Sequence, residues 1–367
     1  MMIISSLDTI IVDLPFKNPG PPSGFGGKEW TTITSLLVRI ETDKGIVGWG
    51  EAFGFNCVTS TEKTIQDLIK PLLIGCKIET PQDIEEISNM LQLKLHIFGR
   101  YGITIFAISG IDIALWDICG KSNNKPIVEL LGGIKSQSLT AYASLFKYDI
   151  ADDTKNVSLR ALEDGYNIIK LHENLIEPIE VTRNAIGNNV KLMVDVNCAW
   201  KEEDMSKILQ QLLDCKLYWL EEPIWPPENF QGLANLRKQG LVISTGENAC
   251  THWQFKEIIT QKAADIIQPS VTKVGGITEM KKISQLDLTK VRMVPHAPYF
   301  GPGFVATLHV LTSLSPHSEI ERLYMDLEQD LYKGLSNIDS KGNIFVPTDP
   351  GLGMEPDLEV INSCQRK

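Results

Sequence analysis

The chain has 367 residues, of which 43% are hydrophobic and 22% charged, and its formal net charge is −11. These are ordinary values for a globular protein, and the length suits one barrel of roughly 200–250 residues with a smaller attached domain. Because the sequence has no basic cluster, nucleic acid is not an expected partner. No apolar run reaches the roughly 18 residues of a membrane span, so a membrane is not expected either.

The N-terminus and the cysteines both favour a cytoplasmic protein. Residues 1–6 lack the basic region and the long apolar core of a secretory signal and are typical of a first strand. The seven cysteines are scattered, odd in number and without a Cys-x-x-Cys pair, which favours reduced thiols.

The first third of the chain predicts an α+β domain over residues 1–132. Apolar and polar positions alternate over residues 1–60, and residues 35–40 and 46–50 are typical of a hairpin. From about residue 61 to 131 the apolar spacing becomes helical.

After residue 135 short β-branched runs alternate with amphipathic helical stretches. Eight such runs predict a parallel (β/α) barrel, which is an α/β fold of the TIM type. The predicted strands are residues 139–143, 167–172, 191–196, 217–221, 241–245, 264–268, 291–295 and 318–321.

Polar residues fall at the C-terminal ends of seven successive predicted strands. They are Lys170, Asp195, Glu221, Glu247, Ser270, His296 and Glu321. The steps between them run from 23 to 26 residues, close to one βα unit each. In a barrel these ends meet on one face, where active sites lie.

Three of these residues predict a metal site. Asp195, Glu221 and Glu247 come from consecutive strands, and two unit charges 4 Å apart repel by about 4 kcal/mol at an effective dielectric of 20. A hard dication with oxygen ligands removes that cost, and Mg²⁺ suits such a site. The alternative is three separate salt bridges at the strand ends.

At this point the sequence resembles a known family, the mandelate racemase and muconate lactonizing family of the enolase superfamily. One stretch resembles its first signature, two resemble its second, and two more are typical of it. The stretch like the first signature is Ala107–Asp117, which runs on to Gly132. The second signature is matched by Val194–Asn197 and Leu220–Pro223, and the two further typical stretches are Thr245–Asn248 and Lys273–Gly276.

The resemblance implies an N-terminal capping domain over residues 1–132, a modified TIM barrel, (β/α)7β, over 133–335, and a C-terminal segment, 336–367, that returns to the cap. It also implies that Asp195, Glu221 and Glu247 bind Mg²⁺. In the Glu-Glu-Pro motif it is the first glutamate that binds. In this superfamily the metal stabilises the charge that develops when a base removes the proton beside a substrate carboxylate.

The second predicted strand supplies two candidate catalytic residues. Alternation places Lys170 and His172 on the same side, facing the barrel mouth. Relatives commonly have Lys-x-Lys here, with the second lysine as a base, and a neutral imidazole can serve that role near pH 7. Lys170 would then steady the substrate carboxylate or act as a base itself. A pair of solvated strand-end residues is the alternative.

The seventh and eighth predicted strands supply two more. His296 matches the family's general-base histidine, but Ser270 stands where many relatives keep an orienting aspartate and the muconate lactonizing branch keeps a lysine. Three roles for His296 stay open: base, electrophile, or base with another orienting partner. Glu321 matches a glutamate that supports the substrate carboxylate, and an ion pair with a basic neighbour is its alternative.

Five residues are candidate substrate contacts: Asn197, Lys273, Phe25, Trp30 and Phe53. Residues 24–27 are glycine-rich and predict a lid over the barrel mouth, with Phe25 and Trp30 as pocket walls.

These features predict a lyase that removes a proton and then eliminates a β-hydroxyl from an acid sugar or related hydroxy acid. A racemase or epimerase of a hydroxy or amino acid is the alternative, and it needs bases on two opposite faces. Cycloisomerisation is disfavoured by Ser270, and a carboxylate-binding barrel without turnover is the non-enzymatic alternative. The expected partner is a small-molecule carboxylate, and relatives lead us to expect a homo-oligomer.

Overall fold

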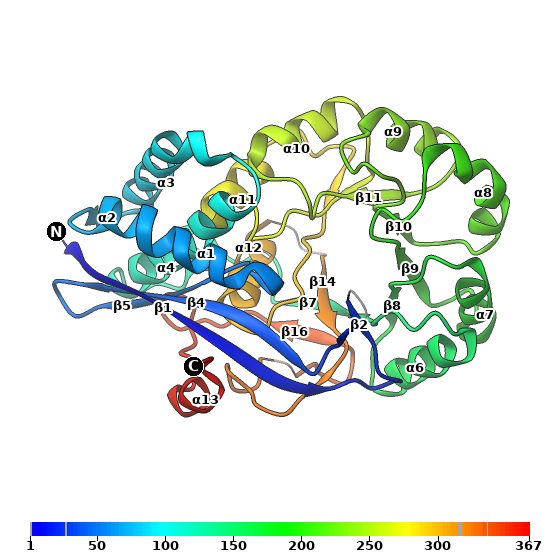
Figure 1. Cartoon of the computed structure of the whole chain (residues 1–367), viewed down its shortest axis with the longest axis horizontal. Coiled ribbons are helices and arrows are strands. Elements are labelled where there is room, and N and C mark those ends of the chain that lie inside the picture. The colour runs from blue at the N-terminus through cyan, green and yellow to red at the C-terminus, as the bar shows by residue number, and fades with distance from the viewer. Residues whose placement is uncertain (1, 26–27, 315–317, 336) are drawn as a thin grey trace.

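The computed structural model describes residues 2–25, 28–314, 318–335 and 337–367, without the side chains of Phe25 and Lys28. The predicted wall Phe25 and part of the predicted lid therefore lie outside the described side chains. Within the described ranges the chain forms a cap and a barrel that lie side by side, at the left and right of Figure 1.

The cap is built on an antiparallel sheet in the order β15-β1-β4-β5, with β6 pairing at one end of β1. Its strands are β1 (Met2–Lys17), β4 (Thr32–Thr42), β5 (Val47–Ala52), β6 (Lys77–Ile78) and β15 (Asp326–Leu327). A short hairpin, β2 (Gly24–Phe25) with β3 (Lys28–Glu29), lies between β1 and β4. The predicted hairpin of β4 and β5 is confirmed.

The helices of the cap come after strands β1, β4 and β5 in the sequence, as the apolar spacing predicted. They are α1 (Val58–Thr64), α2 (Lys70–Leu73), α3 (Pro81–Leu95), α4 (Ile103–Ser122) and α5 (Ile127–Leu130), with short 3₁₀ or π turns at Phe55–Cys57, Ile65–Ile69 and His96–Phe98. Strand β5 packs directly on α4 because glycines meet there. A Cβ on Gly50 would lie 2.0 Å from the carbonyl oxygen of Gly110, so this close approach requires glycine.

Helix α4 is long and apolar enough to span a membrane, the one such helix among the described residues. However, 89% of its most apolar stretch is buried inside the fold. The apolar surface of α4 therefore forms part of the core of the cap.

The barrel has eight parallel strands in the order β13-β12-β11-β10-β9-β8-β7-β14, which confirms the predicted barrel. The strands are β7 (Ser138–Ser144), β8 (Ile168–Leu171), β9 (Lys191–Asp195), β10 (Trp219–Glu221), β11 (Ile243–Thr245), β12 (Ile266–Ile267), β13 (Arg292–Met293) and β14 (Glu319–Leu323). Several strands are shorter than predicted, so Glu247, Ser270 and His296 lie beyond the ends of their strands.

Seven helices and one 3₁₀ turn connect these strands. They are α6 (Ala151–Glu163), α7 (Ile176–Ile186), the turn Glu202–Asp204, α8 (Met205–Asp214), α9 (Phe230–Lys238), α10 (Thr251–Thr260), α11 (Gly276–Ser284) and α12 (Pro302–Leu314). Trp219 and Tyr142 fill the barrel interior, with ring centroids 5.9 Å apart.

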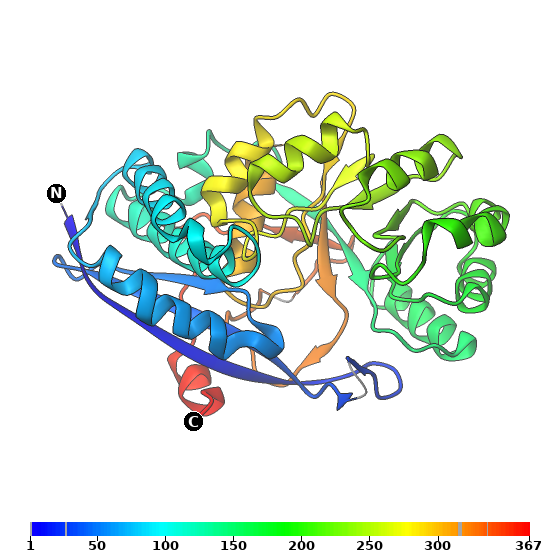
Figure 2. The same cartoon turned by 45° about the horizontal axis from the view of Figure 1, so that its top comes forward.

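The C-terminal segment contacts both parts of the fold. Strand β16 (Asn343–Phe345) pairs with β7 of the barrel, whereas α13 (Leu358–Cys364) lies against β1 beneath the cap sheet (Figure 2). The guanidinium of Arg366 then donates two hydrogen bonds to the carboxylate of Asp13 on β1. The segment thus joins the barrel to the cap. All seven cysteines are free.

Asp117 on α4 ties three distant segments together. Its carboxylate accepts hydrogen bonds from the backbone N–H of Trp49 at 2.9 Å and of Leu352 at 2.8 Å. Lys121 Nζ lies 2.8 Å from it. Burial raises the pKa of Asp117 to about 6, against the opposing effect of Lys121.

We expect Asp117→Ala to lower the free energy of unfolding by about 3 kcal/mol, because two buried N–H groups lose their acceptor and Lys121 loses one of its carboxylate partners. Chemical denaturation followed by circular dichroism measures this. The matched control is Asp152→Ala, which removes an exposed carboxylate beside Lys155 and should leave the transition unchanged. An unchanged transition for Asp117→Ala would show that Asp117 does not hold the segments together.

Candidate active site

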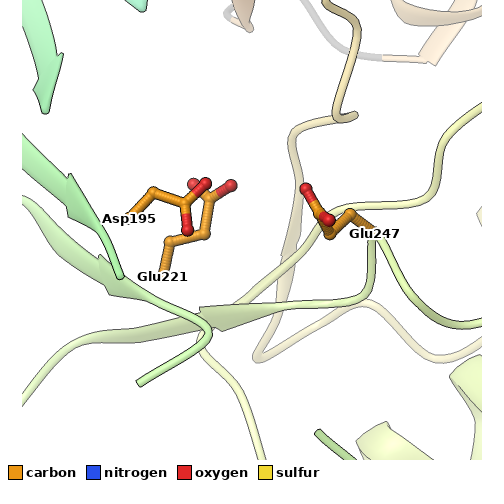
Figure 3. A group of neighbouring side chains, drawn as sticks. All are labelled: Asp195, Glu221 and Glu247. Atoms are coloured by element: carbon orange, nitrogen blue, oxygen red, sulfur yellow. The ribbon is translucent and has the colours of Figure 1, made fainter. Parts of the chain in front are cut away.

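Three carboxylates converge at the C-terminal ends of neighbouring barrel strands. Asp195 ends β9, Glu221 ends β10 opposite Asp195 in the ladder, and Glu247 lies just beyond β11. One oxygen from each lies within 4.8 Å of the other two. Figure 3 shows the three side chains directed toward a shared space.

The donor set fits a hard divalent cation. All three groups offer oxygen. Asp195 Oδ2 is buried and, among the described residues, has only the longer contacts of His172 at 3.3 Å and Lys170 at 3.5 Å. Charge supports the same fit, because two lysines face four carboxylates. These are Lys170 and Lys273 with Asp195, Glu221, Glu247 and Glu321.

Lys170 lies among three of these carboxylates and is fully buried. Its Nζ is 2.8 Å from Glu321, 2.9 Å from Glu221 and 3.5 Å from Asp195. Burial opposes its charge, but Glu221 and Glu321 outweigh burial and hold the pKa of Lys170 well above its usual range. This arrangement fits a lysine that carries positive charge beside the substrate better than it fits a base.

His172 lies one residue beyond the end of β8 and reaches the same carboxylate as Lys170. Its Nε2 lies 3.3 Å from Asp195 Oδ2, where Lys170 also points. Its Nδ1 hydrogen-bonds the carbonyl oxygen of Leu145, which fixes the proton on Nδ1. Burial lowers the pKa of the imidazole, but Asp195 outweighs burial and raises it.

His296 approaches the triad at Glu247. Its Nε2 lies 3.0 Å from Glu247 Oε2, and its Nδ1 lies 3.3 Å from Ser270 Oγ. Ser270 in turn hydrogen-bonds the hydroxyl of Tyr299. The residue that replaces the usual aspartate is therefore itself the partner of His296. Tyr299 was missed in the sequence, where its signal is a hydroxyl-bearing side chain three residues after His296.

Glu321 is buried and forms an ion pair with Lys170. Its carboxylate accepts from Ser144 and from the backbone N–H of Ala297, each at 2.8 Å, and it pairs with Lys170. Burial raises the pKa of the carboxyl, but Lys170 and His296 outweigh burial and lower it. Glu321 thus holds both Lys170 and the loop that carries His296.

The residues that follow the two ligand strands differ in what they contact. Asn197 donates to Asp195 Oδ1 from its backbone N–H at 2.9 Å and from Nδ2 at 3.0 Å. Glu222 turns away from the triad and accepts from Asn248 at 2.6 Å and from Cys198. Burial and Glu247 raise its pKa to about 7.

Aromatic residues of the cap lie next to the triad. Lys273 Nζ is 4.9 Å from the ring centroid of Phe53 and 3.8 Å from Glu247. Phe53 contacts Phe55, which stacks on Trp30 at 5.2 Å. Trp30, predicted as a pocket wall, and Phe53, predicted as a substrate contact, therefore belong to one cluster, and Phe53 is the member that contacts Lys273.

A capped barrel with acidic strand ends is the fold of the enolase superfamily. Residues 21–132 match the mandelate racemase / muconate lactonizing enzyme N-terminal domain, and residues 154–360 match the enolase C-terminal domain-like family. The chain belongs to the mandelate racemase/muconate lactonizing enzyme family. The resemblance seen in the sequence is confirmed.

The relatives of this chain include several named enzymes. Arabinonate dehydratase from Saccharolobus solfataricus is 34% identical, with 87% of each chain covered. D-galactarolactone cycloisomerase from Agrobacterium fabrum is 31% identical, covering 89% of this chain and 90% of the relative. D-xylonate dehydratase from Haloferax volcanii is 29% identical, covering 89% and 84%.

Solved structures show the same fold over the whole chain. A racemase from Streptomyces coelicolor A3(2) with bound magnesium superposes with a TM-score of 0.86 at 25% identity, covering 99% of this chain and 100% of that one. The family thus includes proteins named for three reactions: dehydration, cycloisomerisation and racemisation.

We expect Lys170→Met to lower the free energy of unfolding by about 3–5 kcal/mol in metal-free buffer, because it leaves buried carboxylates without their counter-charge. Urea denaturation in the presence of a chelator measures the change. Lys207→Met, which removes an exposed lysine beside Asp204, is the control and should leave stability unaltered. Equal stability of Lys170→Met and the parent protein would contradict the described charge balance.

Proposed function

We propose that this chain is a Mg²⁺-dependent enzyme that removes the proton α to the carboxylate of a small acid, with dehydration of an acid sugar or related hydroxy acid as the leading reaction. One observation carries the proposal. Two imidazoles point their Nε2 atoms at the carboxylate triad, His172 at Asp195 and His296 at Glu247. The names of the dehydratase relatives support the reaction.

Asp195, Glu221 and Glu247 would hold the metal, which when bound supplies positive charge for the substrate carboxylate and its enolate. Lys170 adds a fixed positive charge beside the ligands, and Glu321 keeps it there. His296 takes the α-proton at Nε2 while its Nδ1 stays bonded to Ser270. The loop carrying His296 is held by the bond from Ala297 to Glu321.

Dehydration then needs a proton for the departing β-hydroxyl. The proton on His296 balances this step, since the imidazolium returns it as the carbon–oxygen bond breaks and water leaves. His172 lies on another side of the triad and is the second group able to donate. The products are water and an enol, which becomes a keto acid.

Two other reactions share the first step. Epimerisation needs a base at each face of the α-carbon, and His172 and His296 are the pair that this chain offers. Cycloisomerisation was disfavoured because Ser270 replaces a lysine, but a cycloisomerase stands among the relatives, so it belongs to the test. A barrel that binds carboxylates without turnover is the non-enzymatic outcome.

The metal assignment predicts that Glu221→Gln loses Mg²⁺ binding, with affinity falling at least about tenfold, because a charged ligand is removed. Isothermal titration with Mg²⁺ alone measures this. Glu222→Gln is the matched control, since Glu222 bonds Asn248 and Cys198 and should keep the affinity. The metal assignment fails if Glu222→Gln loses Mg²⁺ binding and Glu221→Gln keeps it.

The reaction is tested by incubating the Mg²⁺-loaded enzyme with a panel of acid sugars, hydroxy acids and amino acids in D₂O. We expect deuterium at the α-carbon and a keto acid among the products, both followed by NMR. His296→Asn should lower the rate by about 10²-fold or more, the usual contribution of a general base.

Three outcomes separate the alternatives. Exchange without loss of water, together with dependence on His172, would establish an epimerase instead. Isomerisation of a lactone without loss of water would establish a cycloisomerase. Full activity in both His296→Asn and His172→Asn would overturn the proposed bases.

A further inference from the structure

Three polar groups form a chain behind the catalytic face of His296. His296 Nδ1 bonds Ser270 Oγ at 3.3 Å, and Ser270 Oγ bonds the hydroxyl of Tyr299. Ser270 is fully buried and Tyr299 is 5% exposed. The ring of Tyr299 stands edge-on to the imidazole, with centroids 6.1 Å apart.

We propose that Ser270 and Tyr299 form a neutral hydroxyl relay that orients His296, with Tyr299 as a positioning residue that acts through Ser270. The relay deepens the proposed function, on which it rests. It also gives His296 an orienting partner in the absence of the usual aspartate, because a pair of hydroxyls takes the place of that carboxylate.

The chemistry of the imidazole requires an acceptor at Nδ1. Nε2 can take a proton only if it holds a lone pair, so Nδ1 must carry the hydrogen and needs an oxygen to accept it. Ser270 Oγ supplies that oxygen without adding a charge.

A serine hydroxyl alone would orient the imidazole of His296 poorly, because the serine side chain has three staggered rotamers and its hydroxyl hydrogen rotates freely. Tyr299 removes this freedom. Its hydroxyl is carried on a rigid ring with two torsions and is pinned by burial on the far side of Ser270. Burial also raises the pKa of the Tyr299 phenol, so the group stays protonated and uncharged near neutral pH.

The cap holds the loop that carries Tyr299. Glu51 of β5 accepts from the backbone N–H of Gly303 at 2.9 Å and from Ser35 at 2.6 Å. The cavity between Glu51, Phe53 and Tyr299 has a volume of about 10 Å³. That volume holds about one water molecule.

A double-mutant cycle tests the relay. With the Mg²⁺-loaded enzyme, Ser270→Ala and Tyr299→Phe should each lower kcat for α-proton exchange about tenfold, the worth of one neutral hydrogen bond, with little change in KM. Because Tyr299 acts through Ser270, the double variant should be no slower than Ser270→Ala alone. Ser270→Thr keeps the hydroxyl and should restore most of the rate.

Tyr332→Phe is the matched control. Tyr332 is fully buried and its hydroxyl has no hydrogen-bond partner in the part of the chain that is described, so the rate should not change. Multiplying effects in the double variant, or an unaltered rate in Tyr299→Phe, would overturn the relay.

A second measurement separates the relay from the proposed function. Enzyme labelled with ¹⁵N-histidine and loaded with Mg²⁺ reports the tautomer of each imidazole at one fixed pH, and His296→Asn assigns the signal. We expect the Nδ1–H tautomer for His296, with mixing of tautomers in Tyr299→Phe and Ser270→Ala. An Nε2–H tautomer in the parent protein overturns the relay even if the enzyme is active. If the tautomers are as expected but no acid exchanges its α-proton, the relay is supported and the proposed function is rejected.

Discussion

The structure depends on one electrostatic constraint: four carboxylates from barrel strands share a small space with a single fully buried lysine. Lys170 touches Asp195, Glu221 and Glu321, and the remaining carboxylate, Glu247, is reached by His296 and Lys273. Such a cluster is stable only where each charge has a counter-charge or a donor, because uncompensated charge inside a protein is expensive. The parallel barrel is what makes the cluster arise, since it brings the C-terminal ends of strands far apart in sequence to one face. Every other site residue is arranged around the charges that this convergence creates.

The surrounding residues hold the cluster in two layers. Asn197 fixes Asp195, and Glu321 fixes Lys170 together with the backbone after His296. The cap forms the second layer, because Glu51 holds the loop that leads into α12 and Phe53 covers Lys273. The cap in turn is joined to the barrel through Asp117 and the C-terminal segment. The positions of the site residues therefore rely on contacts with segments that lie far away in the sequence.

The barrel could be predicted from the sequence because its signal repeats. Polar residues such as Asp195, Glu221 and Glu247 recur once per βα unit, and a parallel barrel turns that one-dimensional rhythm into proximity. The same logic placed Lys170 and His172 on one side of a strand. It could not place residues beyond the strand ends, because a loop has no such period. Strands β12 and β13 are too short to reach Ser270 and His296, so the bond between them and the contribution of Tyr299 depend on how two loops pack. Asn197 shows the same limit: its backbone lies at φ 46°, which turns its amide back onto Asp195.

The division of labour in the fold also explains how one family holds proteins named for different reactions. Removal of an α-proton uses only groups on strand ends and the loops next to them, and these are set by the barrel. The fate of the enolate depends on which group stands over the neighbouring carbon and on which acid the pocket admits. We propose that those choices fall to His172 and to aromatic residues of the cap such as Phe53 and Trp30. A change confined to these positions can redirect the second step without disturbing the first, because the charge balance around Lys170 is made by other residues. Ser270 contacts His296 and leaves the carboxylate triad intact.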